Sequence, residues 1–219
     1  MLYVSIIYLI KLESLFYPFY KEGVEMFLVS SIKNRLDNIM NIIALKKYHV
    51  RIGKKTQFHG IVSTSGGGTI EIGNNCTISS GKRANPIGGD VRCVFNFGTH
   101  GKIVIGNKCG LSNVTIVANK EVVLEDNVLI GGGVKLYDTD FHSIRYSDRV
   151  NPEGDKNIKC GSIIIHEGAF IGAHSIILKG VSIGRHSVIG AGSVVTKSVP
   201  DGEIWAGNPA KYVKDVPNE

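Results

Sequence analysis

A six-residue period in the branched aliphatic residues constrains this chain more than any other feature of its sequence. In the C-terminal half, a branched aliphatic residue recurs at every sixth position, and a small or β-branched residue follows four positions after each. The two series are Ile165, Ile171, Ile177, Ile183, Ile189 and Val195, and Ala169, Ser175, Val181, Ser187, Ser193 and Val199. This period fits neither a helix nor a plain alternating strand, and it indicates a repeat architecture.

Shorter runs with the same spacing occur earlier in the chain. They are Leu124, Ile130 and Leu136, then Ile105, Leu111 and Val117, and finally Ile72 and Ile78. Cys76 and Cys109 stand where the later repeats have small residues, which predicts that both thiols are core side chains without chemistry. The cysteines form no CxxC pair, which favours a reducing compartment over a disulfide framework.

A six-residue repeat corresponds physically to a short strand and a sharp turn, with the aliphatic side chain pointing inward. Three such sides close a triangular coil of about eighteen residues, and successive coils stack with parallel strands about 4.8 Å apart. The aliphatic residues then form continuous buried columns. The sequence therefore predicts an all-β fold, a parallel β-helix of hexapeptide repeats.

The repeats divide the chain into three parts. Residues 1–48 precede the repeats, residues 49–200 contain them, and residues 201–219 form a tail without the period. Two interruptions that contain Pro and Gly, residues 82–101 and 138–161, predict loops extruded from the repeating body.

The segment before the repeats predicts an amphipathic helix over residues 26–47. Its apolar face comprises Leu28, Ile32, Leu36, Ile39, Met40 and Ile43. We expect this helix to cap the β-helix, because a solenoid needs both ends covered. Peripheral membrane contact by the N-terminal segment is an open alternative, and so is a start at Met26 that would omit residues 1–25. The formal net charge of +6 suits any anionic partner, including a nucleotide cofactor.

The register Ile-Gly-x-x-Ser/Ala/Val-x and the closing runs Val188 to Pro200 and Trp205 to Lys211 resemble the hexapeptide-repeat acyltransferases. The resemblance covers roughly Val50 to Lys214 and is closest to the sugar O-acetyltransferases, including those that modify capsular polysaccharides. It implies a left-handed β-helix, although the general crossover rule gives the opposite hand. It also implies a cytoplasmic homotrimer with active sites between subunits. The implied donor is acetyl-CoA and the implied acceptor a sugar or cell-envelope glycan, with no metal and no nucleic acid.

His142 lies in Tyr-Asp-Thr-Asp-Phe-His-Ser, at the start of the second predicted loop. In the resembled enzymes a histidine at this place is the general base, which suits an acceptor hydroxyl that is a poor nucleophile near neutral pH. Asp140 and Asp138 would project to the same side of an extended chain. Asp140 is the preferred partner of the imidazole, and Asp138 is predicted to contact the sugar or to serve as that partner instead.

The resemblance places the pantetheine arm of the cofactor along the coil edges of the C-terminal repeats. Backbone groups near Ala173 and Ala191 would contact its acyl and amide portions. The hydroxyl and ammonium groups that match family positions near the nucleotide end are those of Thr196, Lys197, Lys211 and Lys214. Trp205 has three open roles: covering the cofactor, stacking on a sugar as a substrate-binding residue, or sealing the last coil.

Two residues depart from the family pattern: Phe170 stands where many relatives have tryptophan, and His166 stands where glycine is usual. An antibiotic, an amino sugar or serine are alternative acceptors, although about 48 residues before the repeats leave little room for the extra domains of some serine and amino-sugar enzymes. A non-catalytic scaffold or a metal site like that of the gamma-type carbonic anhydrases are further alternatives. Against a metal site, His166, His174 and His186 fall at turn or outward positions of the repeat.

Overall fold

The computed structural model describes residues 23–46, 48 and 50–217. The chain divides into two compact units, residues 1–36 and residues 37–219. The helix α2 (Gly23–Lys46) begins in the first unit and ends in the second. Predictions about the first 22 residues, including their membrane contact, fall outside the described residues. Within the residues that the structure describes, no helix is both long enough and apolar enough to cross a membrane.

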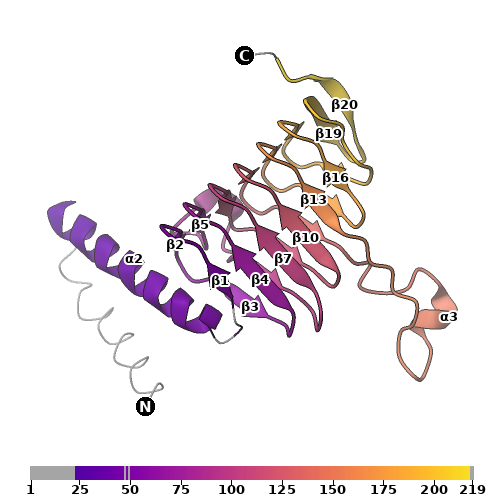
Figure 1. Ribbon diagram of the computed structural model, residues 1–219, viewed down its shortest axis with the longest axis horizontal. Coiled ribbons are helices and arrows are strands. Elements are labelled where there is room, and N and C mark those ends of the chain that lie inside the picture. The colour runs from indigo at the N-terminus through magenta and orange to yellow at the C-terminus, as the bar shows by residue number, and fades with distance from the viewer. Residues whose placement is uncertain (1–22, 47, 49, 218–219) are drawn as a thin grey trace. The chain divides into compact units, whose positions relative to one another are not determined.

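Three sheets, called A, B and C, form the sides of a triangular prism in the second unit (Figure 1). Sheet A contains β1 (Arg51–Ile52), β4 (Thr69–Ile72), β7 (Lys102–Ile105), β10 (Glu121–Leu124), β13 (Ile163–Ile165) and β16 (Ser182–Ile183). Sheet B contains β2 (Gln57–His59), β5 (Thr77–Ser79), β8 (Gly110–Ser112), β11 (Leu129–Ile130), β14 (Phe170–Ile171), β17 (Val188–Ile189), β19 (Glu203–Gly207) and β20 (Ala210–Asp215). Sheet C contains β3 (Ser63–Ser65), β6 (Val94–Asn96), β9 (Thr115–Val117), β12 (Lys135–Tyr137), β15 (Ile176–Leu178) and β18 (Val194–Val195). Each coil adds one strand to A, then B, then C, and coils are numbered in chain order.

Equivalent residues of successive coils pair in register and face the interior. Leu124 pairs with Ile165, and Ile165 pairs with Ile183. All twelve residues of the two series that define the period are buried, and none is more than 3% exposed. The prediction of a left-handed parallel β-helix with continuous aliphatic columns is confirmed. Cys76 and Cys109 are also buried, and each thiol donates a hydrogen bond to a carbonyl of the next coil.

The corners between sheets stack into edges, of which two concern function. The B–C edge comprises the corners at residues 80–93, 113–114, 131–134, 172–175 and 190–193. The C–A edge comprises the corners at residues 97–101, 118–120, 138–162, 179–181 and 196–198. Sheet C lies between these two edges.

The structure differs from the loop predicted over residues 82–101. Val94–Asn96 form β6, which pairs with β3 and β9, and Phe95 and Phe97 are fully buried. Only residues 82–92, called here the 82–92 loop, leave the body of the prism, and they contain the short helical turn η2 (Pro86–Gly88). Aromatic residues fill the interior at this point, so the aliphatic period does not reveal the strand.

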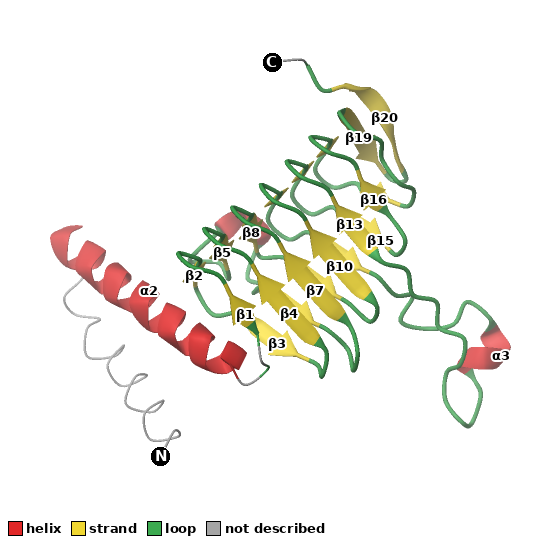
Figure 2. Cartoon of the chain, in the orientation of Figure 1, coloured by secondary structure: helices red, strands yellow, loops and turns green. Residues whose placement is uncertain are grey.

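The second interruption forms an arm, residues 140–160, that projects from the C–A edge (Figure 2). It contains the helix α3 (Tyr146–Arg149). An antiparallel bridge between Thr139 and Cys160 joins the two chain segments where the arm begins and ends. The arm is therefore an insertion between β12 of coil 4 and β13 of coil 5.

Residues 37–46 of α2 cover the first coil with a different face from the predicted one. Asp37, Asn41 and Leu45 are buried, whereas Ile39 and Ile43 are exposed. The Asn41 amide donates to the Gly60 carbonyl and accepts the Val62 N–H. These bonds satisfy backbone groups at an end of the solenoid that has no further coil to pair with, so the capping face is partly polar.

At the other end, the predicted tail continues sheet B as a hairpin. The strand β19 pairs parallel with β17 and antiparallel with β20. Trp205 packs against the core from this hairpin, and Ala210 is buried. The last coil is therefore covered by an antiparallel hairpin rather than by another triangular coil.

Candidate active site

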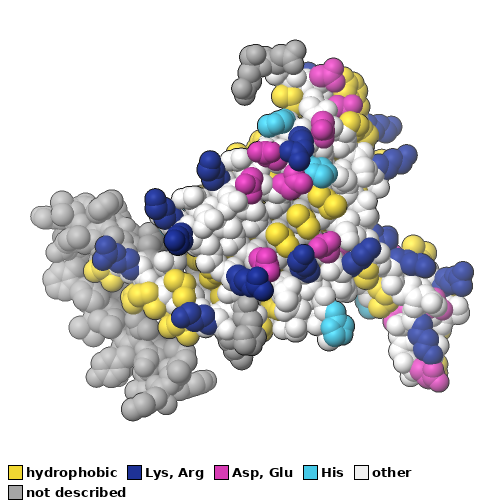
Figure 3. Space-filling model, in the orientation of Figure 1, with side chains coloured by type: hydrophobic (Ala, Val, Ile, Leu, Met, Phe, Trp, Pro, Cys, Tyr) yellow, Lys and Arg dark blue, Asp and Glu magenta, His cyan; other side chains and the backbone are white. Residues whose placement is uncertain are grey.

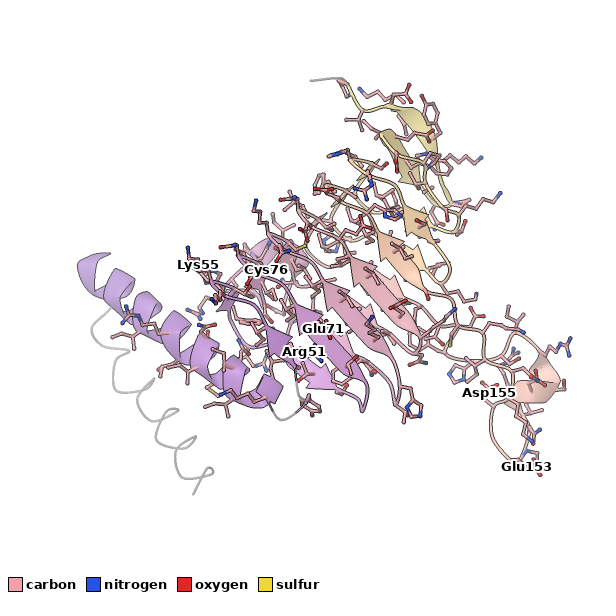
Figure 4. All side chains as sticks on the ribbon, viewed as in Figure 1. Arg51, Lys55, Glu71, Cys76, Glu153 and Asp155 are labelled. Carbon is pink, nitrogen blue, oxygen red and sulfur yellow. The ribbon has the colours of Figure 1, made fainter. Side chains whose placement is uncertain are left out.

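His142 lies on the arm with one ring nitrogen engaged. Its Nδ1 is 2.9 Å from Oδ2 of Asp155, and its side chain is 75% exposed while that of Asp155 is 16% exposed. Asp155 also accepts the Ser143 N–H, so the carboxylate is fixed by the backbone beside the imidazole. Figure 4 labels Asp155 on the arm. A carboxylate on Nδ1 favours the tautomer whose Nε2 is an acceptor.

A second hydrogen-bonded group holds this part of the arm in shape. The Ser143 hydroxyl and the Asn157 amide both donate to Asp148. These two bonds, with the Ser143 bond the stronger cause, lower the pKa of Asp148 below its ordinary value. The segments on either side of α3 are therefore tied together around the His142 to Asp155 pair.

Asp140, predicted to orient the imidazole, has a different partner. Its Oδ1 lies 2.6 Å from Nζ of Lys179, which comes from the C–A corner of coil 5. Its carbonyl accepts the His142 N–H. Asp140 therefore anchors the arm to the prism, and Asp155 takes the orienting position. Asp155 is thirteen residues beyond His142, on the returning segment of the arm, where no spacing rule points to it.

Asp138, predicted to contact the acceptor, is fully buried. Its two oxygens accept the backbone N–H groups of Asn119, Lys120 and Glu121 at 2.7–2.8 Å. A carboxylate with its oxygens occupied inside the chain has no surface for a sugar. The structure therefore assigns Asp138 to the turn of the preceding coil, where it satisfies three donors.

The residues predicted near the nucleotide end partly converge. A cleft of about 220 Å³ is lined by Thr196, Lys197, Trp205, Pro209, Ala210, Lys211 and Tyr212. The Trp205 indole donates to Glu203 at 2.6 Å and packs on the core, so it both lines this cleft and seals the last coil. Lys214 is exposed, pairs with Ile204 in the hairpin, and is not among the lining residues.

Ala173 and Ala191 occupy equivalent corners of coils 5 and 6 on the B–C edge. Neither N–H group donates to an acceptor in the described part of the chain. Gly131 and Gly172 lie against these two N–H groups, where an added Cβ would approach to 2.6 and 2.5 Å. The edge therefore presents two unpaired donors. His142, in contrast, lies on the arm that leaves the C–A edge, on the other side of sheet C.

The outer face of sheet B is hollowed between coils 2 and 5. A depression of about 180 Å³ is lined by Thr77, Ser79, Gly110, Leu111, Ser112, Leu129, Ile130, Gly131 and Phe170. Phe170 and Leu129 are exposed. The depression combines an aromatic and an aliphatic surface with hydroxyl groups, which suits the apolar face and the polar rim of a sugar ring.

The charged groups outside the candidate site include one connected cluster, in which Arg185 contacts Glu125 and Glu167 and His166 contacts Glu125. Acidic and basic side chains are interspersed on the face that Figure 3 shows. On sheet A, Lys102 forms an ion pair with Glu121. Within the described ranges, no three His, Cys, Asp or Glu side chains form a group that could hold a metal ion. His166 contacts Glu125 and Ser182, while the Nε2 of His174 meets the Ile87 carbonyl at 3.1 Å.

Stacked triangular coils with a six-residue period define a class of proteins, the left-handed β-helices. Residues 162–197 match the family model described as bacterial transferase hexapeptide (six repeats). Over these residues the chain is similar to the hexapeptide-repeat transferases.

Named relatives agree with this assignment. Galactoside O-acetyltransferase of Escherichia coli (strain K12) is 39% identical over 104 residues, which are 48% of this chain and 49% of the relative. Galactoside O-acetyltransferase of Lactococcus lactis is 34% identical over 146 residues, which are 67% of this chain and 63% of the relative. The chain thus spans between about half and just under two thirds of these relatives.

A solved structure extends the likeness to the fold. A point mutant of AntD, an N-acyltransferase from Bacillus cereus in complex with dTDP and coenzyme A, superposes with a TM-score of 0.64 at 27% identity. The match covers 78% of this chain and 88% of that one.

Proposed function

We propose that this protein is an O-acetyltransferase that moves an acetyl group from acetyl-CoA to a hydroxyl of a sugar or cell-envelope glycan. The observation that carries the proposal is the His142 to Asp155 pair, an exposed imidazole whose Nδ1 is held by a carboxylate. Its Nε2 has no partner in the described part of the chain. The similarity to two galactoside O-acetyltransferases supports the same reaction class.

His142 acts as the general base in this proposal. Nε2 accepts the proton of the acceptor hydroxyl while that oxygen forms a bond to the acyl carbon, and the bond from carbon to sulfur breaks. Asp155 stabilises the charged imidazolium through Nδ1. The proton on Nε2 then passes to the departing sulfur, which leaves as the thiol. Acetyl-CoA supplies an activated thioester carbonyl, so no protein nucleophile is required.

Two groups of residues at the C-terminal coils support the donor site in this proposal. The unpaired N–H groups of Ala173 and Ala191 suit the carbonyl groups of a pantetheine arm. The cleft with Thr196, Lys197 and Lys211 offers hydroxyl and ammonium groups for phosphates. Trp205 in the same cleft supplies a flat surface for the nucleotide base. A CoA thioester as donor also favours a cytoplasmic enzyme.

The separation of these parts supports a homotrimer in this proposal. His142 projects from the C–A edge, while Ala173 and Ala191 lie on the B–C edge. The arm also exposes Ile144 and Tyr146, which no other described residue covers. We infer that the arm of one subunit reaches the B–C edge of the next, where three copies around an axis form three equivalent sites.

Transfer to an amino group is the second candidate, and the likeness to AntD favours it. AntD, an N-acyltransferase described with dTDP and coenzyme A, is matched over 88% of its chain, which supports an amino group as the acceptor. Labelled acetyl-CoA, offered with matched sugars that carry only hydroxyl groups or one amino group, separates the two reactions.

The test of the mechanism uses His142→Ala and Asp155→Asn in the full chain. We expect His142→Ala to lower acetyl transfer by at least about 100-fold, with the Kd for CoA unchanged. We expect Asp155→Asn to lower kcat by about 10-fold or more and to shift the pH profile of kcat, because the amide cannot stabilise the imidazolium. Lys156→Ala, on the neighbouring exposed residue, is the matched control. Full activity of His142→Ala would remove this residue from the reaction.

A further inference from the structure

The 82–92 loop runs along the B–C edge from coil 2 to coil 5. Asn113 of coil 3 holds its base, since its amide donates to the Asn85 carbonyl and accepts the Gly81 N–H, both at 2.8 Å. A further anchor is the Arg83 to Asp37 ion pair at 2.6 Å. The loop is therefore fixed to the prism rather than free in solvent, and Figure 2 shows its turn η2 beside β8.

The tip of the loop lies on coils 4 and 5. Gly88 covers Gly132 of coil 4 so closely that a Cβ on Gly132 would come within 2.8 Å of the Gly88 nitrogen. In coil 5, His174 Nε2 is 3.1 Å from the Ile87 carbonyl oxygen. Ile87 is 67% exposed, so most of its surface is not packed against the described part of the chain.

The tip of the 82–92 loop closes the B–C edge at coil 4. Ile130 pairs with Ile171, so Gly132 is the coil 4 equivalent of Ala173. In coils 5 and 6 this position presents a free N–H group, whereas in coil 4 it is buried beneath the loop. A ligand that lies along the edge can extend over coils 6 and 5 only. The end wall stands about one coil spacing, about 4.8 Å, beyond Ala173.

We propose that Ile87 and the turn η2 form the end wall of the acyl subsite and restrict the donor to short acyl chains. The inference rests on the proposed function, in which the thioester lies beside Ala173. The nucleotide cleft lies beyond coil 6, so a pantetheine arm that descends from it points its acyl group toward coil 4. An acetyl group fits within one coil spacing, while a longer alkyl chain meets Ile87. Ile87 thus sets which acyl group is transferred, without taking part in proton transfer.

The experiment compares binding of CoA, acetyl-CoA, butyryl-CoA and hexanoyl-CoA to the full chain by isothermal titration calorimetry. We expect the wild-type protein to bind hexanoyl-CoA at least about 10-fold more weakly than acetyl-CoA. In Ile87→Ala, the Kd for hexanoyl-CoA should fall by about 10-fold or more, while the Kd for CoA stays the same. Val91→Ala, which truncates the other large exposed aliphatic residue of the same loop, should leave all four values unchanged.

Two outcomes would overturn the inference while the proposed function stands. One is equal affinity of the wild-type protein for acetyl-CoA and hexanoyl-CoA, and the other is an unchanged ratio of the two in Ile87→Ala. No binding of any of the four compounds to the wild-type protein would overturn the proposed function and the inference together. The unchanged affinity of Ile87→Ala for CoA also verifies that this variant is folded.

Discussion

The substitution Asp138→Asn removes one acceptor oxygen from the C–A edge and puts an amide donor in its place. In the structure, Oδ1 of Asp138 accepts the Asn119 N–H at 2.8 Å. Oδ2 accepts the N–H groups of Lys120 at 2.7 Å and Glu121 at 2.8 Å. The asparagine keeps the first bond and loses the other two. Its NH₂ group would also face two other donors inside a turn that excludes water from the Asp138 side chain.

The expected loss of stability follows from these contacts. A hydrogen bond to a charged acceptor contributes about 1.5–3 kcal/mol net, so two lost bonds correspond to roughly 3–6 kcal/mol. Lys120 is exposed, so water can satisfy part of the freed backbone donors. We therefore expect a decrease of about 3 kcal/mol in the free energy of unfolding, a large part of the usual total of about 5–15 kcal/mol.

Urea unfolding of both proteins at one fixed protein concentration, followed by circular dichroism, measures this difference. Asp140→Asn is the matched control, because it removes a partly exposed ion pair with Lys179, worth about 1 kcal/mol or less. If Asp138→Asn unfolded within about 1 kcal/mol of the wild type and instead raised the KM for the acceptor, Asp138 would return to a substrate-binding role. The structural account of this residue would then be wrong.

Two further predictions concern acid stability and subunit sharing. Hydrogen bonds from the Asn107 N–H and then from its side-chain amide lower the pKa of Asp126 below its ordinary value of 3.8. The stability that this carboxylate contributes is therefore present above pH 3.8 and is lost as the pH falls through the folded-state pKa. Asp126→Asn should therefore be less stable than the wild type in urea at neutral pH, with the difference vanishing in more acid solution; a difference that persists there would contradict this. We expect the variants His142→Ala and Ala191→Trp each to be inactive alone. If each site combines residues of two copies, co-refolding the two variants should restore about one quarter of wild-type activity. No recovery in the activity assay would place the whole site in one chain.

The aliphatic columns were predictable because each buried position repeats with the same spacing and chemistry. The strand β6 was not, because Phe95 and Phe97 fill the interior there and the 82–92 loop breaks the phase. The capping face of α2 was also missed. Apolar periodicity points to Ile39 and Ile43, but the first coil ends in unpaired backbone groups that need polar partners, and Asn41 supplies them.

At the candidate site, the sequence predicts the histidine but not the carboxylate that contacts its ring. His142 follows from the motif and lies exposed on the arm, as a general base requires. The carboxylate beside it does not follow, because alternation along an extended chain predicts Asp140 and the backbone is not extended there. Phe141 has a φ of +62°, which turns the chain between Asp140 and His142 and sends the two side chains to different partners.

The same period that predicts the columns also assigns residues to edges. Ala173 and Ala191 are eighteen residues apart, one full coil, so they stack on one edge. Lys197 is six residues beyond Ala191, which is one side of the triangle, so it lies on the C–A edge. The arm with His142 leaves the same edge, one coil before the corner that contains Lys179. The strands of sheet C lie between these two edges. This arrangement supports the proposal that the Ala173 N–H and the His142 imidazole of one site come from two copies of the chain.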